Sequence, residues 1–356
     1  MNRLVEYGSV EAIPFYDCSN KTFDEWEKTG VKKGWFGYPL VIFGVFIEFL
    51  YIPIIYIIIK TKLIRHACYK IILMLAMIDM SATCCSCLIT GPLLIIGSVF
   101  CMYPTFTYVA GGFVLNIGLA SKFFESDFSK FLQKLLEDLI FILPDTWCMA
   151  CAATVSLFAN RIISIGFREY ADVIEKKLAY SSIAFVLFYG FYIYYFTPSI
   201  VYNSDIMAWL PDPLSEDVPS PEAAAMYKNT IQAWNNWIFV TCMFVLFSVY
   251  FAMVKRLARG QKSKASKAIF IQCSIICFFN TATALVYNAL AIVTPAPWIL
   301  AFGQICWACN HACPAIIYVT MNDTIRREFY RLVFRIKKVE DATSSAAVKS
   351  TTQSKI

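Results

Sequence analysis

Blocks of apolar residues with almost no charge, each long enough to cross a bilayer, dominate this sequence. Of its 356 residues, 58% are hydrophobic and only 16% are charged, whereas soluble domains average about 25% charged residues. A soluble protein of this size would still need a polar surface over its core. Because the apolar residues are gathered into blocks, we expect lipid to surround them, and the sequence predicts an integral membrane protein.

A helix needs about 20 apolar residues to span the hydrocarbon core of a membrane. Eight stretches meet this requirement: 38–59, 69–90, 98–120, 146–166, 178–199, 234–254, 268–293 and 298–320. The polar residues before the first stretch contain no cleavable signal peptide, so that stretch itself is expected to act as the targeting signal.

The charges between these stretches decide how many of them cross. Loops rich in Lys and Arg stay in the cytoplasm, which places 60–67, 255–267 and the tail after 320 inside. The loop 200–233 is acidic, with Lys228 as its one base, and belongs outside. An odd number of crossings must separate 60–67 from 200–233, but four candidates lie between them. One candidate is therefore surplus, and we predict seven crossings with the N-terminus outside.

Residues 117–146 explain the surplus, because they interrupt the third helix with an amphipathic segment. Charged and amide side chains alternate there with an apolar face at helical spacing. That face consists of Phe124, Phe128, Phe131, Leu132, Leu135 and Leu139. Such a helix either lies on a membrane surface or is an insertion without a function, and we favour the insertion.

The predicted fold class is thus an all-α membrane protein, a seven-transmembrane helix bundle with an insert in helix 3. An extracellular segment (1–37) precedes the transmembrane domain (38–320), which carries the insert 117–146. A short cytoplasmic helix parallel to the membrane, helix 8, is expected over 321–340. The small polar residues 341–356 predict a disordered cytoplasmic tail.

Catalytic and metal-binding motifs are not found in the sequence. His66 and His311 are its two histidines, and HExxH, GxSxG and P-loop patterns do not occur, so we predict no enzyme, no metal and no cofactor. The clusters CCSC (84–87) and CWACNHAC (306–313) invite a metal interpretation. Helical geometry turns His311 about 160–200° away from Cys309, however, and small residues at helix contacts explain these cysteines better.

Ionisable residues inside a membrane are rare and usually face the interior of the bundle. Glu48 and Asp79 lie within the first and second apolar stretches. They are either hydrogen-bonded packing residues or a polar centre that switches between two helix arrangements. Arg161, preceded by Asn160, lies at the cytoplasmic end of the third helix. It is either an interface anchor or a contact for a cytoplasmic partner.

The last helix contains the most specific cluster in the chain. Pro314 kinks the helix and frees a backbone carbonyl, and Tyr318 follows one turn later. Asn322 and Arg326 then introduce a segment that suits a short amphipathic helix under the membrane.

Two cysteines and one asparagine distinguish the outer face. Cys18 and Cys101 are the cysteines that the topology places there, so they form either a disulfide or two free thiols, and we favour the disulfide. Asn20 begins the glycosylation sequence Asn-Lys-Thr on the outer side. Asn322 begins a second such sequence, on the inner side, where no glycan is added.

The last helix resembles the end of rhodopsin-like receptors, in which a proline and a tyrosine close helix 7 before helix 8. Asp79 and the pair Asn160-Arg161 resemble the helix-2 aspartate and the arginine of the DRY motif in those receptors. The chain departs from them at several points. Cys313 replaces the asparagine before Pro314, Asn160 replaces an acid, and no CWxP motif occurs in helix 6.

A narrower group fits these departures. The strings YGSVEAIPFYDCS (7–19), LYIPIIYIIIKTKLIRHACYKI (50–71), FCMYPTFTYVAGG (100–112) and WCMACAATVSLFANR (147–161) resemble the class T serpentine chemoreceptors of nematodes. The resemblance covers about residues 6–340 except the insert. In that family helix 3 runs almost directly from the FCxYP segment into the W…NR segment. We therefore hypothesise that 117–146 is a lineage-specific insertion or a mis-predicted exon.

The resemblance implies a chemosensory G-protein-coupled receptor of the plasma membrane, with the ciliary membrane of sensory neurons as one expected location and no nucleic-acid partner. A small apolar or volatile ligand is expected among outer aromatic residues, namely Tyr103, Phe106, Tyr108 and Trp237. Asp79, Asn160, Arg161, Pro314, Tyr318 and Asn322 would form the switch. Arg161, Lys255, Arg256 and Arg326 would face a heterotrimeric G protein.

Three alternatives remain open from the sequence. A transporter or channel would need repeats or several charges at the membrane midplane, whereas the chain has two isolated carboxylates. A scaffold without a ligand would leave the proline–tyrosine cluster without a role. A receptor disrupted by the insert would not function.

Overall fold

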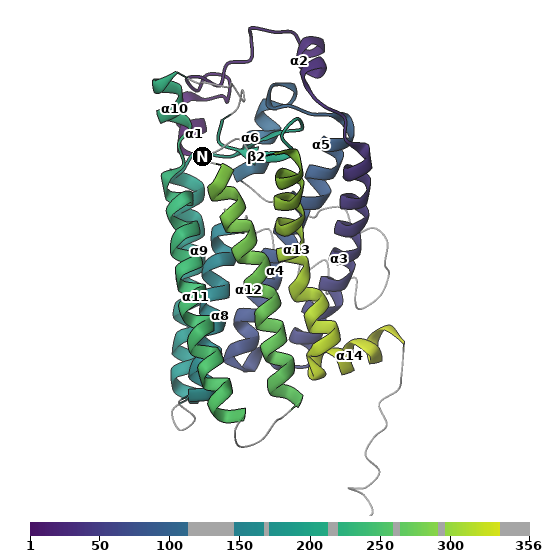
Figure 1. Cartoon of the computed structure of the whole chain (residues 1–356), viewed down its shortest axis with the longest axis vertical. Coiled ribbons are helices and arrows are strands. Elements are labelled where there is room, and N and C mark those ends of the chain that lie inside the picture. Colours follow the sequence, from purple (N-terminus) through teal and green to yellow (C-terminus); the bar gives the residue numbers. More distant parts are fainter. Residues whose placement is uncertain (113–145, 167–170, 213–219, 259–263, 291–295, 335–356) are drawn as a thin grey trace, which may run out of the picture.

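The computed structural model (Figure 1) describes residues 1–112, 146–166, 171–212, 220–258, 264–290 and 296–334. Two sequence predictions concern segments beyond this part of the chain. Of the insert 117–146, only the last residue is described, and the tail 341–356 lies outside the described residues altogether.

Long helices packed side by side form the body of the molecule (Figure 1). In chain order they are α3 (Gly34–Lys60), α4 (Ala67–Thr83) continued through η2 (Cys84–Ile89) into α5 (Thr90–Ile96), α8 (Thr146–Gly166), α9 (Ala171–Phe196), α11 (Thr230–Ala258), α12 (Lys264–Leu290) and α13 (Pro297–Met321). Within the described residues, six of these helices are long and apolar enough to cross a membrane, and the apolar part of α12 is Ser274–Ala289. The predicted all-α bundle of seven helices is confirmed.

The surplus candidate, 98–120, does not form a crossing of its own in the described part of the chain. It holds the short helix η3 (Phe100–Met102) and the nine-residue helix α6 (Pro104–Gly112). The third crossing resumes as α8, which begins at Thr146 and packs against α4, α9 and α11. The hydropathy signal near 98–120 therefore comes from the outer part of helix 3.

A π-helical turn, η2, interrupts the second crossing. The hydroxyl of Thr90 donates to the carbonyl of Cys85 (2.7 Å), and Pro92, which has no backbone N–H, follows in the next turn. A proline removes one helical hydrogen bond, and a wide turn of this kind accommodates the loss. Close packing of α3 on this segment depends on glycines: a Cβ on Gly37 would lie 2.6 Å from the carbonyl oxygen of Gly91.

A cap covers the outer end of the bundle, where the N-terminus lies in Figure 1. It consists of α1 (Asn2–Tyr7), α2 (Phe23–Thr29), α10 (Pro221–Tyr227) and the hairpin β1 (Val201–Asn203) and β2 (Ala208–Leu210). The two strands pair antiparallel, with Val201 opposite Leu210. Trp209 points into the protein, and its indole nitrogen donates to the Thr90 hydroxyl at 2.9 Å. The hairpin thereby closes over the second crossing.

Helix α14 (Asp323–Val333) leaves the opposite end of the bundle sideways (Figure 1). Asn322 separates it from α13, and its side-chain oxygen accepts from the Ile325 amide at 3.1 Å, which caps the new helix. Ile325 is buried, whereas Leu332 and Val333 are exposed. An amphipathic helix 8 was predicted over 321–340, and α14 is this helix in the described part of that range.

Candidate functional site

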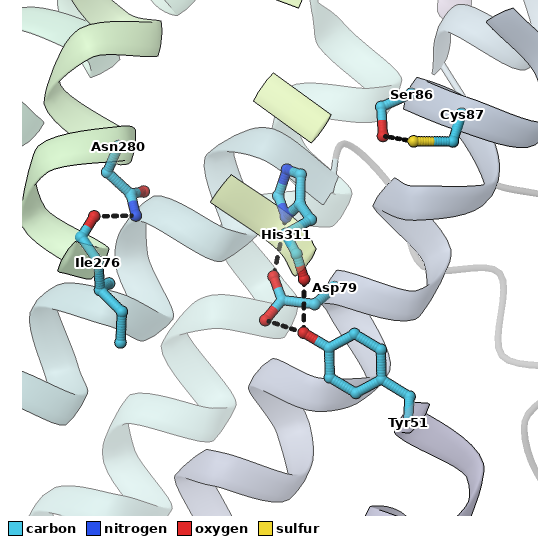
Figure 2. Close-up of polar contacts among 7 residues, drawn as sticks. All are labelled: Tyr51, Asp79, Ser86, Cys87, Ile276, Asn280 and His311. Carbon is cyan, nitrogen blue, oxygen red and sulfur yellow. Dashed lines mark hydrogen bonds and ion pairs between the residues drawn. The ribbon is translucent and has the colours of Figure 1, made fainter. Parts of the chain in front are cut away.

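A buried carboxylate holds three helices together near the middle of the bundle. Asp79 of α4 lies 2.8 Å, Oδ1 to Nδ1, from His311 of α13, and both side chains are at most 2% exposed. The Tyr51 hydroxyl of α3 donates to the backbone carbonyl of His311 (2.5 Å) and lies 3.2 Å from the other carboxylate oxygen. Figure 2 shows the three side chains converging. We call Tyr51, Asp79 and His311 the polar centre.

The position of His311 connects this centre to the kink of the last helix. Pro314 lies three residues further along α13, within its helical span. A proline there cannot donate to the carbonyl four residues back, which belongs to Asn310. The adjacent carbonyl of His311 accepts from Tyr51 instead of relying on the helix alone. The kinked part of α13 is thus fixed to α3 and α4 by side chains.

Sequence reasoning placed Asp79 in a polar centre but missed its partner. The sequence singled out His311 only because cysteines flank it. A single histidine in a helix does not show which distant helix its side chain contacts. Its second ring nitrogen, Nε2, is buried with no hydrogen-bond partner. Within the described residues no group of three His, Cys, Asp or Glu side chains is placed to hold a metal ion.

Glu48 lies apart from the polar centre. Its Oε1 accepts from the Cys84 thiol at 3.6 Å, and its Oε2 is buried with no partner. The contact joins α3 to the start of the π-helical turn. Glu48 is therefore a packing residue of the α3–η2 contact in this structure, which is one of the two interpretations that the sequence left open.

A second polar network lies among α8, α9, α11 and α12. The Trp147 indole donates to the side-chain oxygen of Asn236 (2.8 Å), and Asn236 in turn donates to Asn288 (3.1 Å). Neighbouring Asn235 accepts from the Tyr189 hydroxyl at 2.9 Å. Buried amides and hydroxyls of this kind are stable in a membrane because they satisfy one another. We call these five residues the asparagine network.

Trp147 links the asparagine network to the polar centre. Its ring meets the His311 ring edge-on, with centroids 6.3 Å apart. Trp147 also lines a cavity of about 50 Å³ that lies between the outer ends of the helices and the loop before β1. One side chain therefore touches the cavity, the asparagine network and the polar centre.

The cavity has aromatic and polar walls. Its lining within the described residues is Cys85, Ala110, Gly111, Thr146, Trp147, Tyr194, Thr197, Pro198, Ser199, Ile200, Asn229, Gln232 and Trp307. These residues come from six segments that are far apart in the sequence. Convergence of several helices around one cavity in the outer half of a bundle is typical of a ligand site.

None of the four aromatic residues predicted for the pocket lines this cavity. Tyr103, Phe106 and Trp237 are 41–48% exposed at the outer surface of the helices. Tyr108 is fully buried beneath the cap, where its ring meets that of Tyr16 edge-on at 5.7 Å. Exposed aromatic side chains near helix ends suit the membrane interface, which fits Tyr103, Phe106 and Trp237, whereas Tyr108 packs inside the cap.

The inner end of the bundle carries the predicted switch and partner residues. Asn160 is fully buried, and neither its side-chain oxygen nor its nitrogen has a hydrogen-bond partner among the described residues. Arg161, one position further, is partly exposed. Tyr318 is buried in α13, one turn after Pro314. Asn160 and Tyr318 therefore lie in the interior of the bundle, while Arg161 lies at the edge of that interior.

The basic residues predicted to face a G protein lie at this same end. Lys255 and Arg256, in the last turn of α11, are exposed. Arg326 donates to the carbonyl of Thr320 (2.9 Å) and pairs with Asp323 (2.5 Å). Arg326 thereby fixes α14 to the end of α13, whereas the side chains of Lys255 and Arg256 are exposed to solvent.

A disulfide joins Cys18 to Cys101, with Cα atoms 5.5 Å apart. This is the pair that the sequence favoured for the outer face. The backbone oxygen of Cys18 accepts from the Trp26 indole at 3.1 Å, which fastens α2 to the same point. Asn20 lies exposed in the turn between Cys18 and α2, where a glycan would be in solvent.

Comparison with known proteins gives concordant matches. A sequence profile described as "Serpentine type 7TM GPCR chemoreceptor Srt" matches residues 3–123 and 141–343. The interval between the two matched parts falls within the predicted insert. The chain is also 20% identical over 339 residues to serpentine receptor class T-55 of Caenorhabditis elegans, covering 91% of this chain and 82% of that receptor.

Proposed function

The chain belongs to the Srt family of serpentine seven-transmembrane chemoreceptors, and on that premise we propose that a small molecule binds its outer cavity and activates a cytoplasmic G protein. One observation carries the proposal: Trp147 lines the cavity and contacts His311 of the polar centre. A ligand in the cavity would therefore press on a residue that contacts the joint between α3, α4 and α13.

The polar centre suits a switch between two arrangements of the helices. A ligand shifts such an equilibrium only as far as it binds one state better than the other. Displacement of Trp147 would change its contact with His311 and its hydrogen bond to Asn236 together. The lower part of α13, beyond Pro314, would move with that joint, and Tyr318 and Asn322 would follow.

The inner end would then receive the G protein. Arg161, Lys255 and Arg256 lie at this end and carry positive charge, which favours association with an acidic surface. We propose Asn160 and Arg161 as the inner part of the switch. The plasma membrane, and the ciliary membrane of a sensory neuron in particular, is the proposed location.

The two histidines of the chain provide a matched test. His311 belongs to the polar centre, whereas His66 is exposed at the start of α4. We expect His311→Ala to change ligand-independent nucleotide exchange on a co-expressed G protein severalfold, corrected for surface expression, because Asp79 loses its partner. His66→Ala should leave the exchange within about twofold, since exposed substitutions rarely matter.

Unchanged exchange in His311→Ala at normal surface level would show that the polar centre is no switch. A surface-expressed receptor that activates none of a broad set of G proteins would contradict the signalling proposal as a whole. The same assay on the chain lacking 117–146 decides whether the insert prevents function.

A further inference from the structure

We infer that the outer cavity selects a small, uncharged molecule that carries a hydrogen-bond acceptor, such as a short-chain ketone, ester or alcohol. The inference rests on the proposed function and names the ligand class for the same site. Within the described residues, none of the cavity-lining side chains is acidic or basic. A charged ligand would lose its hydration without gaining a counterion there, which is strongly unfavourable.

Several polar groups in the cavity wall are already engaged by the protein. Asn229 donates to the carbonyl of Pro198 (3.1 Å) and accepts from the amide of Gln232 (3.0 Å). The Thr197 hydroxyl donates to its own helix, to the carbonyl of Ile193 (2.7 Å). The Trp147 indole is committed to Asn236. These groups shape the wall and offer little to a ligand.

Three other lining residues have a polar side-chain group that makes no hydrogen bond within the described residues. They are the hydroxyl of Thr146, the side-chain amide of Gln232 and the indole N–H of Trp307. Thr146 and Trp307 are each 7% exposed, and none of the three polar groups is among the fully buried, unpaired atoms of the described residues. These groups are therefore accessible, and a ligand atom that accepts hydrogen bonds can pair with them.

Trp307 sets the polarity of the ligand, because an indole N–H can only donate. The Thr146 hydroxyl and the Gln232 amide can each donate and accept. A carbonyl or ether oxygen, with its two lone pairs, can accept from Trp307 and from one of the other two groups. The rings of Trp147 and Trp307, with Ala110 and Ile200, provide apolar walls for the remainder of the molecule. An apolar body with one accepting oxygen therefore fits this lining, which narrows the small apolar or volatile ligand expected from the sequence.

The size of the cavity limits the ligand. A cavity holds about one water for each 10–15 Å³ of such volume, so about 50 Å³ holds only a few water-sized groups. Drug-sized sites are about 300–1,000 Å³. The site in this state therefore accommodates a molecule of a few heavy atoms, and a larger one would have to displace Trp147 or the loop before β1.

Three-carbon probes test the ligand class directly, because they match the size of the cavity. The purified full-length receptor would be heated with acetone, propan-1-ol, propane, n-propylammonium or propanoate, and the ligand-dependent rise in Tm would be measured. We expect the ketone and the alcohol to bind about tenfold more tightly than the hydrocarbon, as one hydrogen bond contributes about a factor of ten. The two ions should give no rise.

Variants connect the selectivity to the cavity. Gln232→Leu and Trp307→Phe should each reduce the preference for ketone over hydrocarbon to near unity while retaining the Tm of the free receptor. Trp237→Phe is the matched control, because Trp237 is half exposed on the outer surface and does not line the cavity. It should leave the preference unchanged.

Each other result overturns the inference. An ion that stabilises best, a hydrocarbon equal to the ketone, a panel in which no neutral polar probe binds, or an unaltered preference in both cavity variants would do so. Binding of the ketone without nucleotide exchange on any co-expressed G protein would instead contradict the proposed signalling and leave the ligand class standing.

Discussion

Tyr51 is the residue through which α3 reaches the other two helices of the polar centre. Its hydroxyl is buried and lies between the Asp79 carboxylate and the His311 carbonyl. Both acceptors are inaccessible to water. If the Tyr51 hydroxyl were removed, no solvent molecule could donate a hydrogen bond to them in its place. The cost of removing this one oxygen atom therefore measures how strongly the centre ties α3 to α13.

We expect Tyr51→Phe to lower the free energy of unfolding by about 1–3 kcal/mol, since it leaves a buried acceptor unsatisfied. Tyr38→Phe on the same helix is the control, because Tyr38 is 59% exposed. Thermal unfolding of the purified receptor would report both changes. Equal Tm values for the two variants would show that the Tyr51 hydroxyl holds nothing together.

Asn160 shows the opposite relation between polarity and stability. Its amide is buried without a partner, which is costly unless the group has a function. We expect Asn160→Leu, which keeps the number and branching of the side-chain heavy atoms, to raise the free energy of unfolding by about 1–3 kcal/mol and to reduce G-protein activation. Residues kept for function commonly show this trade-off.

The same substitution at Asn229 provides the contrast for this prediction. Asn229 both donates and accepts, to Pro198 and from Gln232, so Asn229→Leu should destabilise the protein. If Asn160→Leu also lowers the Tm, the Asn160 amide is satisfied in the folded protein and no trade-off exists.

At this scale the sequence identified some partners and missed others. Asp79 was recognisable because an acid inside an apolar block is rare. His311 and Trp147 were not, since their roles depend on which faces of distant helices meet, and this packing is not encoded in local spacing. Aromatic composition likewise does not show which way a side chain faces: Tyr103 and Trp237, predicted for the pocket, are 41% and 48% exposed.

Among the helices, the contact between the first and second crossings depends most on shape. A Cβ placed on Gly91 would lie 2.5 Å from the side chain of Val41 and 2.9 Å from the Gly37 carbonyl. Small residues let membrane helices approach closely, and packing of this kind replaces the hydrophobic effect in lipid. The π-helical turn lies directly before Gly91, so the turn and the glycine together set how α5 meets α3.

Gly91→Ala should therefore destabilise the receptor by about 1–3 kcal/mol through overpacking. Gly34→Ala serves as its control, because a Cβ there meets only the Tyr38 ring, at 3.3 Å. Thermal unfolding and surface expression would both fall for Gly91→Ala and stay near the parent values for Gly34→Ala. A Gly91→Ala receptor as stable as the parent would mean that α3 and α5 can move apart without cost.

The elements themselves were more predictable than their contacts. Apolar length located the long helices, with ends that differ from the observed ones by up to seven residues, and charge parity removed the surplus candidate. Pro314 and the amphipathic pattern after Asn322 correctly indicated a short terminal helix. The π-helical turn and the hairpin β1–β2 were not predicted, because three-residue strands and a single wide turn leave no periodic signal in the sequence.

The whole molecule has two chemically different ends, and their separation follows from charge. The last turn of α11, with Lys255 and Arg256, and α14 lie at one end, while α10, the disulfide and α2 lie at the other (Figure 1). Each end carries one glycosylation sequence, beginning at Asn20 and at Asn322. The chain therefore contains its own reporters of orientation.

We expect a glycan on Asn20 alone, because only the outer face of the membrane protein meets the glycosylation machinery. Asn20 is exposed in a turn, and the Thr22 hydroxyl of its sequence is close to solvent, donating to Glu25 at 2.9 Å. Asn20→Gln should abolish the glycosidase-sensitive mobility shift of the expressed receptor. Thr324→Ala, which removes the inner sequence but spares the Asn322 cap of α14, should leave the shift intact. The reverse pattern would invert the orientation, place Lys255 and Arg256 outside the cell, and remove the surface on which any cytoplasmic G protein could act.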